Sequence, residues 1–202
     1  MVMDKYHIIL ASNSPRRKEL LAGLGLAFDV RVLQGIDESY PPTLPTRDIA
    51  EYISQKKAAA YREQLADDEL LITADTIVVL GDEVMGKPVD EQDASHMLHK
   101  LSGKTHQVIT GVTLTTKERQ QSFSVLTDVT FKQLSDEEID YYIVHYRPMD
   151  KAGAYGIQEW IGYIGVTGLN GSYFNVMGLP VQRIYEALKT YGITPVGGTQ
   201  HT

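Results

Sequence analysis

The run from Leu70 to Leu80 limits the fold of this chain more than any other feature. Its side chains are apolar and largely β-branched, which is typical of a buried strand. Asp75 interrupts the run at its centre. Aspartate is unfavourable in strands, and a carboxylate removed from water needs a cation, a hydrogen-bond donor or a metal. We therefore expect a buried strand with a functional acid. The alternative is a bulge that returns Asp75 to water.

Strands and helices are predicted along the whole chain. The apolar patterns predict strands at residues 6–11, 28–32, 70–80, 83–85, 105–116, 121–125, 127–134, 163–167 and 173–177. Helices are predicted at residues 16–26, 46–66 and 90–101, from 135 to before Pro148, and from Pro180 to 191. Ser14, Asp90 and Ser135 are the expected N-caps, and Gly25 is expected to close the first helix. The resulting class is mixed α/β, with one domain over residues 1–193 and a frayed tail over 194–202.

Composition excludes several classes of protein. The chain has 202 residues, of which 43% are apolar and 22% charged, enough for one core or two small lobes. A net charge of −7 disfavours stable binding to nucleic acid. Cysteine is absent, so disulfides and thiolate sites are excluded. No membrane-spanning run or signal peptide is recognisable, and a cytoplasmic location is expected.

Two arginines occupy an unusual place at the start of a predicted helix. Arg16 and Arg17 follow Ser12–Pro15, which form a turn between a strand and that helix. Cations are unfavourable in a first helical turn, whereas an anion is favoured there by the free backbone N–H groups. A bound phosphate would resolve this conflict. The alternative is a pair of solvated arginines near Glu19.

Three further charged positions could contribute to the same chemistry. Lys87 precedes a helix N-terminus and could share an anion with it. In the predicted helix over residues 46–66, Lys56 lies nearer the apolar stripe and Lys57 on its flank. Periodicity alone does not choose between these two lysines. Glu38 could supply a second carboxylate for Mg²⁺, which prefers oxygen ligands.

These segments together resemble the Maf family, the septum-formation-protein-like nucleoside triphosphate pyrophosphatases. The matching motifs occur in the family's order at Ala11–Arg17, Ala74–Thr76, Gly86–Pro88, Ser102–Val108, Thr127–Phe131, Asp150–Gln158, Asn170–Tyr173 and Gly178–Pro180. The resemblance implies a Maf/ITPase-like fold with an elongated mixed sheet and two lobes around a deep central cleft. It also implies a homodimer.

The resemblance further implies hydrolysis of a nucleoside triphosphate to the monophosphate and pyrophosphate with a divalent cation, Mg²⁺ or Mn²⁺. Asp75 takes the family's general-base position, and whether it acts as a base, a metal ligand or both remains open. Glu38 and Asp75 are the metal-ligand candidates. The motif match favours Lys57 over Lys56. The substrate-binding residues implied by the match are Ser12, Arg16, Arg17, Lys57, Thr76, Lys87 and Gln158.

Substrate choice follows from three of these positions. Arg16, Thr76 and Gln158 resemble the branch that prefers dTTP and UTP, and Glu159 stands where a glycine is more usual in the family. One alternative keeps the same chemistry on a modified purine nucleotide such as 7-methyl-GTP. The other alternative is a non-catalytic binder of nucleotides or nucleic acid in cell-division control. The sequence contains neither a P-loop nor a convincing Gly-x-Gly-x-x-Gly fingerprint.

Overall fold

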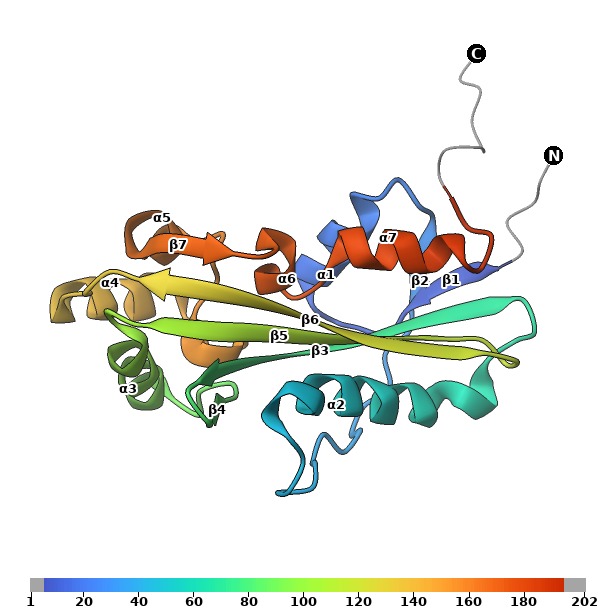
Figure 1. Cartoon of the computed structure of the whole chain (residues 1–202), viewed down its shortest axis with the longest axis horizontal. Coiled ribbons are helices and arrows are strands. Elements are labelled where there is room, and N and C mark those ends of the chain that lie inside the picture. Colours follow the sequence, from blue (N-terminus) through green and yellow to red (C-terminus); the bar gives the residue numbers. More distant parts are fainter. Residues whose placement is uncertain (1–5, 195–202) are drawn as a thin grey trace, which may run out of the picture. The chain divides into compact units, whose positions relative to one another are not determined.

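A computed structural model describes residues 6–194 of the chain and confirms the mixed α/β class (Figure 1). The strands are β1 (His7–Leu10), β2 (Phe28–Val30), β3 (Glu69–Leu80), β4 (Glu83–Met85), β5 (Thr105–Thr115), β6 (Gln120–Phe131) and β7 (Val166–Asn170). The α-helices are α1 (Pro15–Ala22), α2 (Thr46–Tyr61), α3 (Glu91–Leu101), α4 (Asp136–Tyr146), α5 (Trp160–Gly165), α6 (Tyr173–Met177) and α7 (Val181–Lys189). Short 3₁₀ helices span Arg62–Gln64 and Ala152–Ala154. The strand order is β2-β1-β3-β5-β6-β7, and β4 pairs with β3.

The described residues form two compact units. Unit 1 comprises residues 6–75, 111–124 and 178–194, and unit 2 comprises residues 76–110 and 125–177. The division falls between Asp75 and Thr76, so β3 contributes residues to both units, as β5 and β6 also do. No helix within residues 6–194 combines the length and apolar character needed to cross a membrane.

Unit 1 is built on parallel strand pairing. Strand β1 pairs in parallel with β2 on one side and with β3 on the other. Helix α2 lies on one side of these strands and α7 on the other (Figure 1). One apolar cluster of unit 1 joins the side chains of Ile9, Ala58, Tyr61, Leu65 and Leu71. This packing fixes α2, the helix that carries Lys56 and Lys57, against the parallel strands.

A glycine determines how closely α2 approaches the strands. A Cβ atom built on Gly111 of β5 would lie 2.2 Å from the carbonyl carbon of Ala50 in α2. Real Cβ contacts do not reach such distances, so only glycine fits at this position. The backbone of α2 therefore rests directly on β5.

Unit 2 surrounds a buried aromatic cluster. His106, Phe131 and Tyr155 pack edge to face, with ring centroids 4.9–5.4 Å apart. The ring of His106 also hydrogen-bonds to the hydroxyl of Tyr155 over 2.6 Å. Strand β4 returns antiparallel to β3 through the turn at Gly81, and β7 pairs antiparallel with β6. His106 is thus a hydrogen-bonding residue near the start of a strand.

The helix starts follow the sequence closely. Ser14, Asp90 and Ser135 each accept a hydrogen bond from a backbone N–H of the first turn, which confirms the three predicted N-caps. Ser135 also forms the capping box with Glu138. The end of α1 differs from the prediction, because the helix stops at Ala22 with Gly23 as its C-cap.

The strand prediction is wrong in two regions. Residues 121–125 and 127–134 were expected to be separate strands, but β6 runs without a break over Gln120–Phe131. Residues 163–167 and 173–177 were expected to be strands, yet residues 163–165 form the second half of α5 and residues 173–177 form α6, so only residues 166–167 lie in a strand, β7. The tail expected over residues 194–202 lies, apart from Thr194, outside the described residues.

Candidate functional site

The turn between β1 and α1 is organised by two serines. Ser12 is buried, and its Oγ accepts a hydrogen bond from the backbone N–H of Ser14 over 3.2 Å. Ser14 in turn caps α1 by accepting from the backbone N–H of Arg17 over 3.4 Å. Because Pro15 occupies the first helical position, its missing N–H costs the helix nothing. The turn thus holds the N-terminus of α1 in a defined position.

Arg17 projects from the first turn of α1 into unit 1. Its Nε donates to the carbonyl oxygen of Gly178 over 2.8 Å, and its Nη1 donates to that of Ala74 over 2.9 Å. Burial lowers the pKa of Arg17, and the negative charge of Asp75 opposes that effect. Arg17 is therefore not a solvated surface arginine. Its neighbour Arg16 is partly buried.

Asp75 lies at the point in β3 where the sequence predicts it, and its side chain is only 13% exposed. The ammonium group of Lys57 lies 2.8 Å from Asp75 Oδ1 and 3.0 Å from Glu38 Oε1. Lys57 also donates to the carbonyl oxygen of Ala74 over 3.4 Å. The strand therefore does not return Asp75 to bulk water. Three of the predicted side chains, Glu38, Lys57 and Asp75, come together as one charged cluster.

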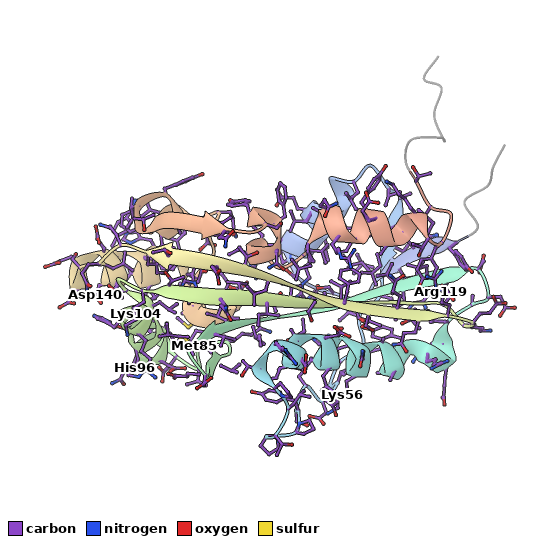
Figure 2. All side chains as sticks on the ribbon, viewed as in Figure 1. Lys56, Met85, His96, Lys104, Arg119 and Asp140 are labelled. Carbon is purple, nitrogen blue, oxygen red and sulfur yellow. The ribbon has the colours of Figure 1, made fainter. Side chains whose placement is uncertain are left out.

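The neighbouring lysine, Lys56, contacts a different acidic residue. Lys56, labelled in Figure 2, donates to Asp37 Oδ2 over 2.5 Å and to the carbonyl oxygen of Ser39 over 2.9 Å. The hydrogen bond from Lys56 is the main reason that the pKa of Asp37 lies far below its ordinary value. Asp37 and Ser39 flank Glu38. Sequence reasoning missed this role, although a lysine beside Lys57 and an aspartate beside Glu38 were the available signal.

The donor set of this cluster fits a divalent cation that takes oxygen ligands. Glu38 and Asp75 supply carboxylate oxygens, and the Glu38 side chain is 52% exposed. Within residues 6–194, no group of three or more His, Cys, Asp and Glu side chains could hold a metal ion. Mg²⁺ is commonly held by one or two carboxylates, and substrate phosphates and water complete its shell. A two-carboxylate site satisfies that requirement.

The remaining predicted residues belong to unit 2. Thr76 Oγ1 shares a hydrogen bond of 2.9 Å with Thr110 Oγ1. Lys87 is exposed in the segment between β4 and α3. Gln158 is partly buried, and its Oε1 is one of the buried oxygens that lack a hydrogen-bond partner in the described structure. An orphaned buried acceptor is rare in proteins and calls for an explanation.

Comparison with known proteins identifies the family. The model of the family described as "Maf-like protein" matches residues 7–191. The chain belongs to the Maf-like protein family. The cluster of Glu38, Lys57 and Asp75 and the capped turn at α1 are therefore features of a Maf-like protein.

Curated Maf-like relatives cover nearly the full length of this chain. A protein of Phocaeicola vulgatus named dTTP/UTP pyrophosphatase is 68% identical over 187 residues, which are 93% of this chain and 97% of that protein. A protein of the same name from Bacteroides thetaiotaomicron is 60% identical with the same coverage. One from Porphyromonas gingivalis is 50% identical over 94% of this chain and 96% of that protein.

A solved structure was also found. The crystal structure of a nucleoside-triphosphatase, dITP/XTP pyrophosphatase, from Mycobacterium abscessus matches with a TM-score of 0.41 and 15% sequence identity. That match covers 96% of this chain and all of the other chain.

Proposed function

We propose that this chain is an enzyme that hydrolyses dTTP and UTP to the nucleoside monophosphate and pyrophosphate. Relatives that are 50–68% identical over most of the chain carry the name dTTP/UTP pyrophosphatase. The observation that supports the chemistry best is the position of Lys57, whose ammonium group contacts both Asp75 and Glu38. In this cluster the ammonium group can bind the triphosphate, and the two carboxylates can bind its metal ion.

In the proposed reaction, the oxygen of a water molecule attacks the α-phosphorus. The bond from the α-phosphorus to the bridging oxygen breaks, and pyrophosphate leaves with the electron pair. Asp75 orients this water or accepts its proton, and its low exposure of 13% keeps the carboxylate away from bulk water. Charge on the phosphoryl oxygens must be stabilised, so most of the rate enhancement comes from positioning and electrostatics.

Cationic side chains and a helix terminus bind the triphosphate in this proposal. Arg16 and Arg17 lie in the first turn of α1, whose backbone N–H groups and dipole favour an anion. Ser12 supports that turn, and Lys57 supplies a further positive charge from α2. Lys87 of unit 2 is assigned to the phosphates by the family motif.

Glu38 and Asp75 would hold Mg²⁺ or Mn²⁺. When bound, the ion would neutralise charge on the phosphates and polarise the phosphoryl group. Lys57 keeps the two carboxylates close to a single positive group when no cation is bound, which reduces their mutual repulsion.

Base recognition is assigned to Gln158, with Thr76 and Arg16 as the other specificity positions. Uracil and thymine present one N–H donor between two carbonyl acceptors. A glutamine amide offers a matching acceptor and donors on one group. The buried, unpartnered Oε1 of Gln158 supports this assignment because it can accept a hydrogen bond from the base.

A triphosphate panel tests the function. Pyrophosphate release is measured for dTTP, UTP, CTP, ATP, GTP and 7-methyl-GTP with Mg²⁺ or Mn²⁺. We expect the highest kcat/KM for dTTP and UTP. If kcat/KM is highest for 7-methyl-GTP, the substrates are modified purine nucleotides. If no triphosphate releases pyrophosphate, the chain is a non-catalytic binder.

We further propose that the enzyme acts in the cytoplasm as a homodimer. The homodimer follows from the family resemblance, and the cytoplasmic location is the expectation drawn from the composition. Light scattering after size-exclusion chromatography tests the assembly, because a dimer has twice the chain mass of 22.5 kDa. A mass equal to that of one chain across the working concentration range would contradict it.

A further inference from the structure

Tyr142 of α4 lies at the centre of a buried network around Gln158. The side chain of Tyr142 is fully buried, and its hydroxyl donates to Glu159 Oε2. The same hydroxyl accepts a hydrogen bond from the backbone N–H of Gly156 over 3.0 Å. One oxygen atom therefore ties together residues on both sides of Gln158.

Lys151 contacts the other carboxylate oxygen of Glu159. Its Nζ lies 3.2 Å from Glu159 Oε1 and 2.8 Å from Asp150 Oδ1, and Lys151 is only 7% exposed. Burial, assisted by the hydrogen bond to Glu159, raises the pKa of Tyr142, so its hydroxyl stays protonated as a donor. Both carboxylate oxygens of Glu159 are thus held by directed contacts.

Gln158 packs tightly within this network. A Cβ atom built on Gly156 would lie 3.0 Å from Gln158 Nε2 and 3.1 Å from both Glu159 Cδ and Lys151 Cε. The backbone of Gly156 and the side chains of Gln158, Glu159 and Lys151 therefore share one small space. Gln158 Oε1 is nevertheless left without a hydrogen-bond partner among the described residues. The network therefore borders the amide nitrogen, and the buried amide oxygen is an acceptor with no partner among the described residues.

We propose that Tyr142 and Glu159 are positioning residues that fix the orientation of the Gln158 amide and thereby the choice between pyrimidine bases. The proposal rests on the assignment of base recognition to Gln158 in the proposed function. An amide held with its oxygen toward the base accepts from N3–H of uracil or thymine. Cytosine presents an acceptor at N3 and a donor at N4, so it requires the reversed amide. Loss of the network releases the amide and weakens this discrimination.

Tyr142→Phe is the primary test, because it removes one hydroxyl and keeps the ring. The measurement is the ratio of kcat/KM for UTP to that for CTP. We expect this ratio to fall by at least about fivefold, chiefly through a higher KM for UTP. Tyr155→Phe is the matched control, since it removes another buried hydroxyl of unit 2 that bonds to His106. The control should keep the wild-type ratio.

A second pair of variants keeps the test informative if Tyr142→Phe does not fold. Glu159→Gln keeps an acceptor for Tyr142 or Lys151, whereas Glu159→Ala removes both contacts. We expect the UTP-to-CTP ratio to fall further in Glu159→Ala than in Glu159→Gln. A purely structural role predicts equal losses for both nucleotides and an unchanged ratio in every variant. That result would overturn the proposal.

Binding measurements separate this proposal from the proposed function. Calorimetry with the α,β-methylene analogues of UTP and CTP reports base discrimination without hydrolysis. If the wild type releases pyrophosphate and the variants keep its discrimination, only the positioning role fails. If the wild type releases none but the variants lose discrimination in binding, the positioning role stands and the enzymatic function fails. A wild type that binds both analogues equally well would overturn the positioning role itself.

Discussion

Arg17 and Lys57 donate hydrogen bonds to the same backbone carbonyl oxygen, that of Ala74, over 2.9 and 3.4 Å. Ala74 directly precedes Asp75 in β3. Two cations from different helices therefore meet at the carbonyl group that precedes Asp75, the acid proposed for the reaction. Contact with this carbonyl fixes both cationic groups relative to Asp75 before any substrate binds. Such preorganisation lowers the cost of arranging charges during the reaction.

Asp75→Asn should abolish most of the activity. The change keeps the shape of the side chain but removes the charge and the proton acceptor, so kcat for UTP should fall at least about 100-fold. Pyrophosphate release measures the loss. Asp29→Asn is the matched control, because Asp29 is an exposed strand residue of unit 1 whose side chain hydrogen-bonds to the ring of His7 over 2.8 Å. Turnover by Asp75→Asn within a few-fold of wild type would remove Asp75 from the chemistry.

Substitutions of the two adjacent lysines of α2 should lower activity to different extents. Lys57→Met removes the cation that contacts Asp75 and Glu38, and we expect kcat/KM for UTP to fall by about 100-fold or more. Lys56→Met removes an exposed contact to Asp37 and should lower kcat/KM by less than about tenfold. Steady-state kinetics of both variants with UTP gives the two kcat/KM values to be compared. Equal losses would contradict the distinct assignments.

Arg17→Met should reduce stability as well as activity. It removes two charge-assisted hydrogen bonds to the carbonyl oxygens of Gly178 and Ala74, so the free energy of unfolding should drop by about 2–4 kcal/mol. Urea denaturation measures this change. Lys18→Ala on the same helix removes only an exposed contact to Asn13 and should stay within about 0.5 kcal/mol of wild type. A stable Arg17→Met protein would show that these bonds contribute little to folding.

Glu38→Gln should alter the dependence of activity on metal. The variant removes one of the two carboxylates proposed for Mg²⁺, so the Mg²⁺ concentration for half-maximal activity should rise about tenfold or more. Titration of Mg²⁺ after treatment with EDTA gives this value. Glu51→Gln changes a carboxylate of α2 that bonds to Ser124 and Gln55, and it serves as control. An unchanged Mg²⁺ requirement in Glu38→Gln would exclude Glu38 from the metal site.

His106 should make stability depend on pH in the mildly acidic range. Burial lowers the pKa of His106 from 6.5 to about 4, so the unfolded chain binds a proton at a higher pH than the folded chain does. The contribution of neutral His106 to the free energy of unfolding is therefore fully present above pH 6.5 and is lost as the pH falls toward 4. The full effect is about 3 kcal/mol.

The measurement for His106 is the free energy of unfolding in urea at several pH values between 4 and 7. His106→Gln should have a shallower pH dependence than wild type, whatever its absolute stability. Because the carboxylates titrate in both proteins, the difference between the two curves isolates the histidine. Parallel curves would show that His106 does not contribute to the pH dependence.

Local sequence patterns, namely N-cap residues and the composition of strands, were sufficient to predict many of the helices and strands of this fold. The N-caps at Ser14, Asp90 and Ser135 were predictable because each is a short-range contact between a side chain and a backbone N–H three residues ahead. The strand around Asp75 was predictable because its neighbours are mostly apolar or β-branched. Periodicity did not choose between Lys56 and Lys57, because both lie on one helix; the family resemblance favoured Lys57, and the tertiary contacts of the two lysines differ.

The glycine-rich region shows where sequence patterns failed. Residues 163–167 contain apolar and β-branched side chains and were expected to form a strand, but α5 covers Trp160–Gly165 and only residues 166–167 belong to β7. A Cβ atom on Gly162 would lie 1.7 Å from the carbonyl oxygen of Ile157, so a close backbone approach determines this segment. The helix α6 is likewise fixed from a distance, because Asn175 donates to the carbonyl oxygen of Val108 and to Thr127 Oγ1. Neither contact has a local sequence signal.

The direct contact between Gly111 and the backbone of Ala50 constrains how this enzyme can evolve. Any side chain at position 111 would force α2 outward, and the ammonium group of Lys57 would move with it away from the acid in the neighbouring strand. A residue with no functional atoms thereby controls the spacing of an ion pair it never touches. Mutational tolerance at position 111 should accordingly be as low as at the charged positions themselves.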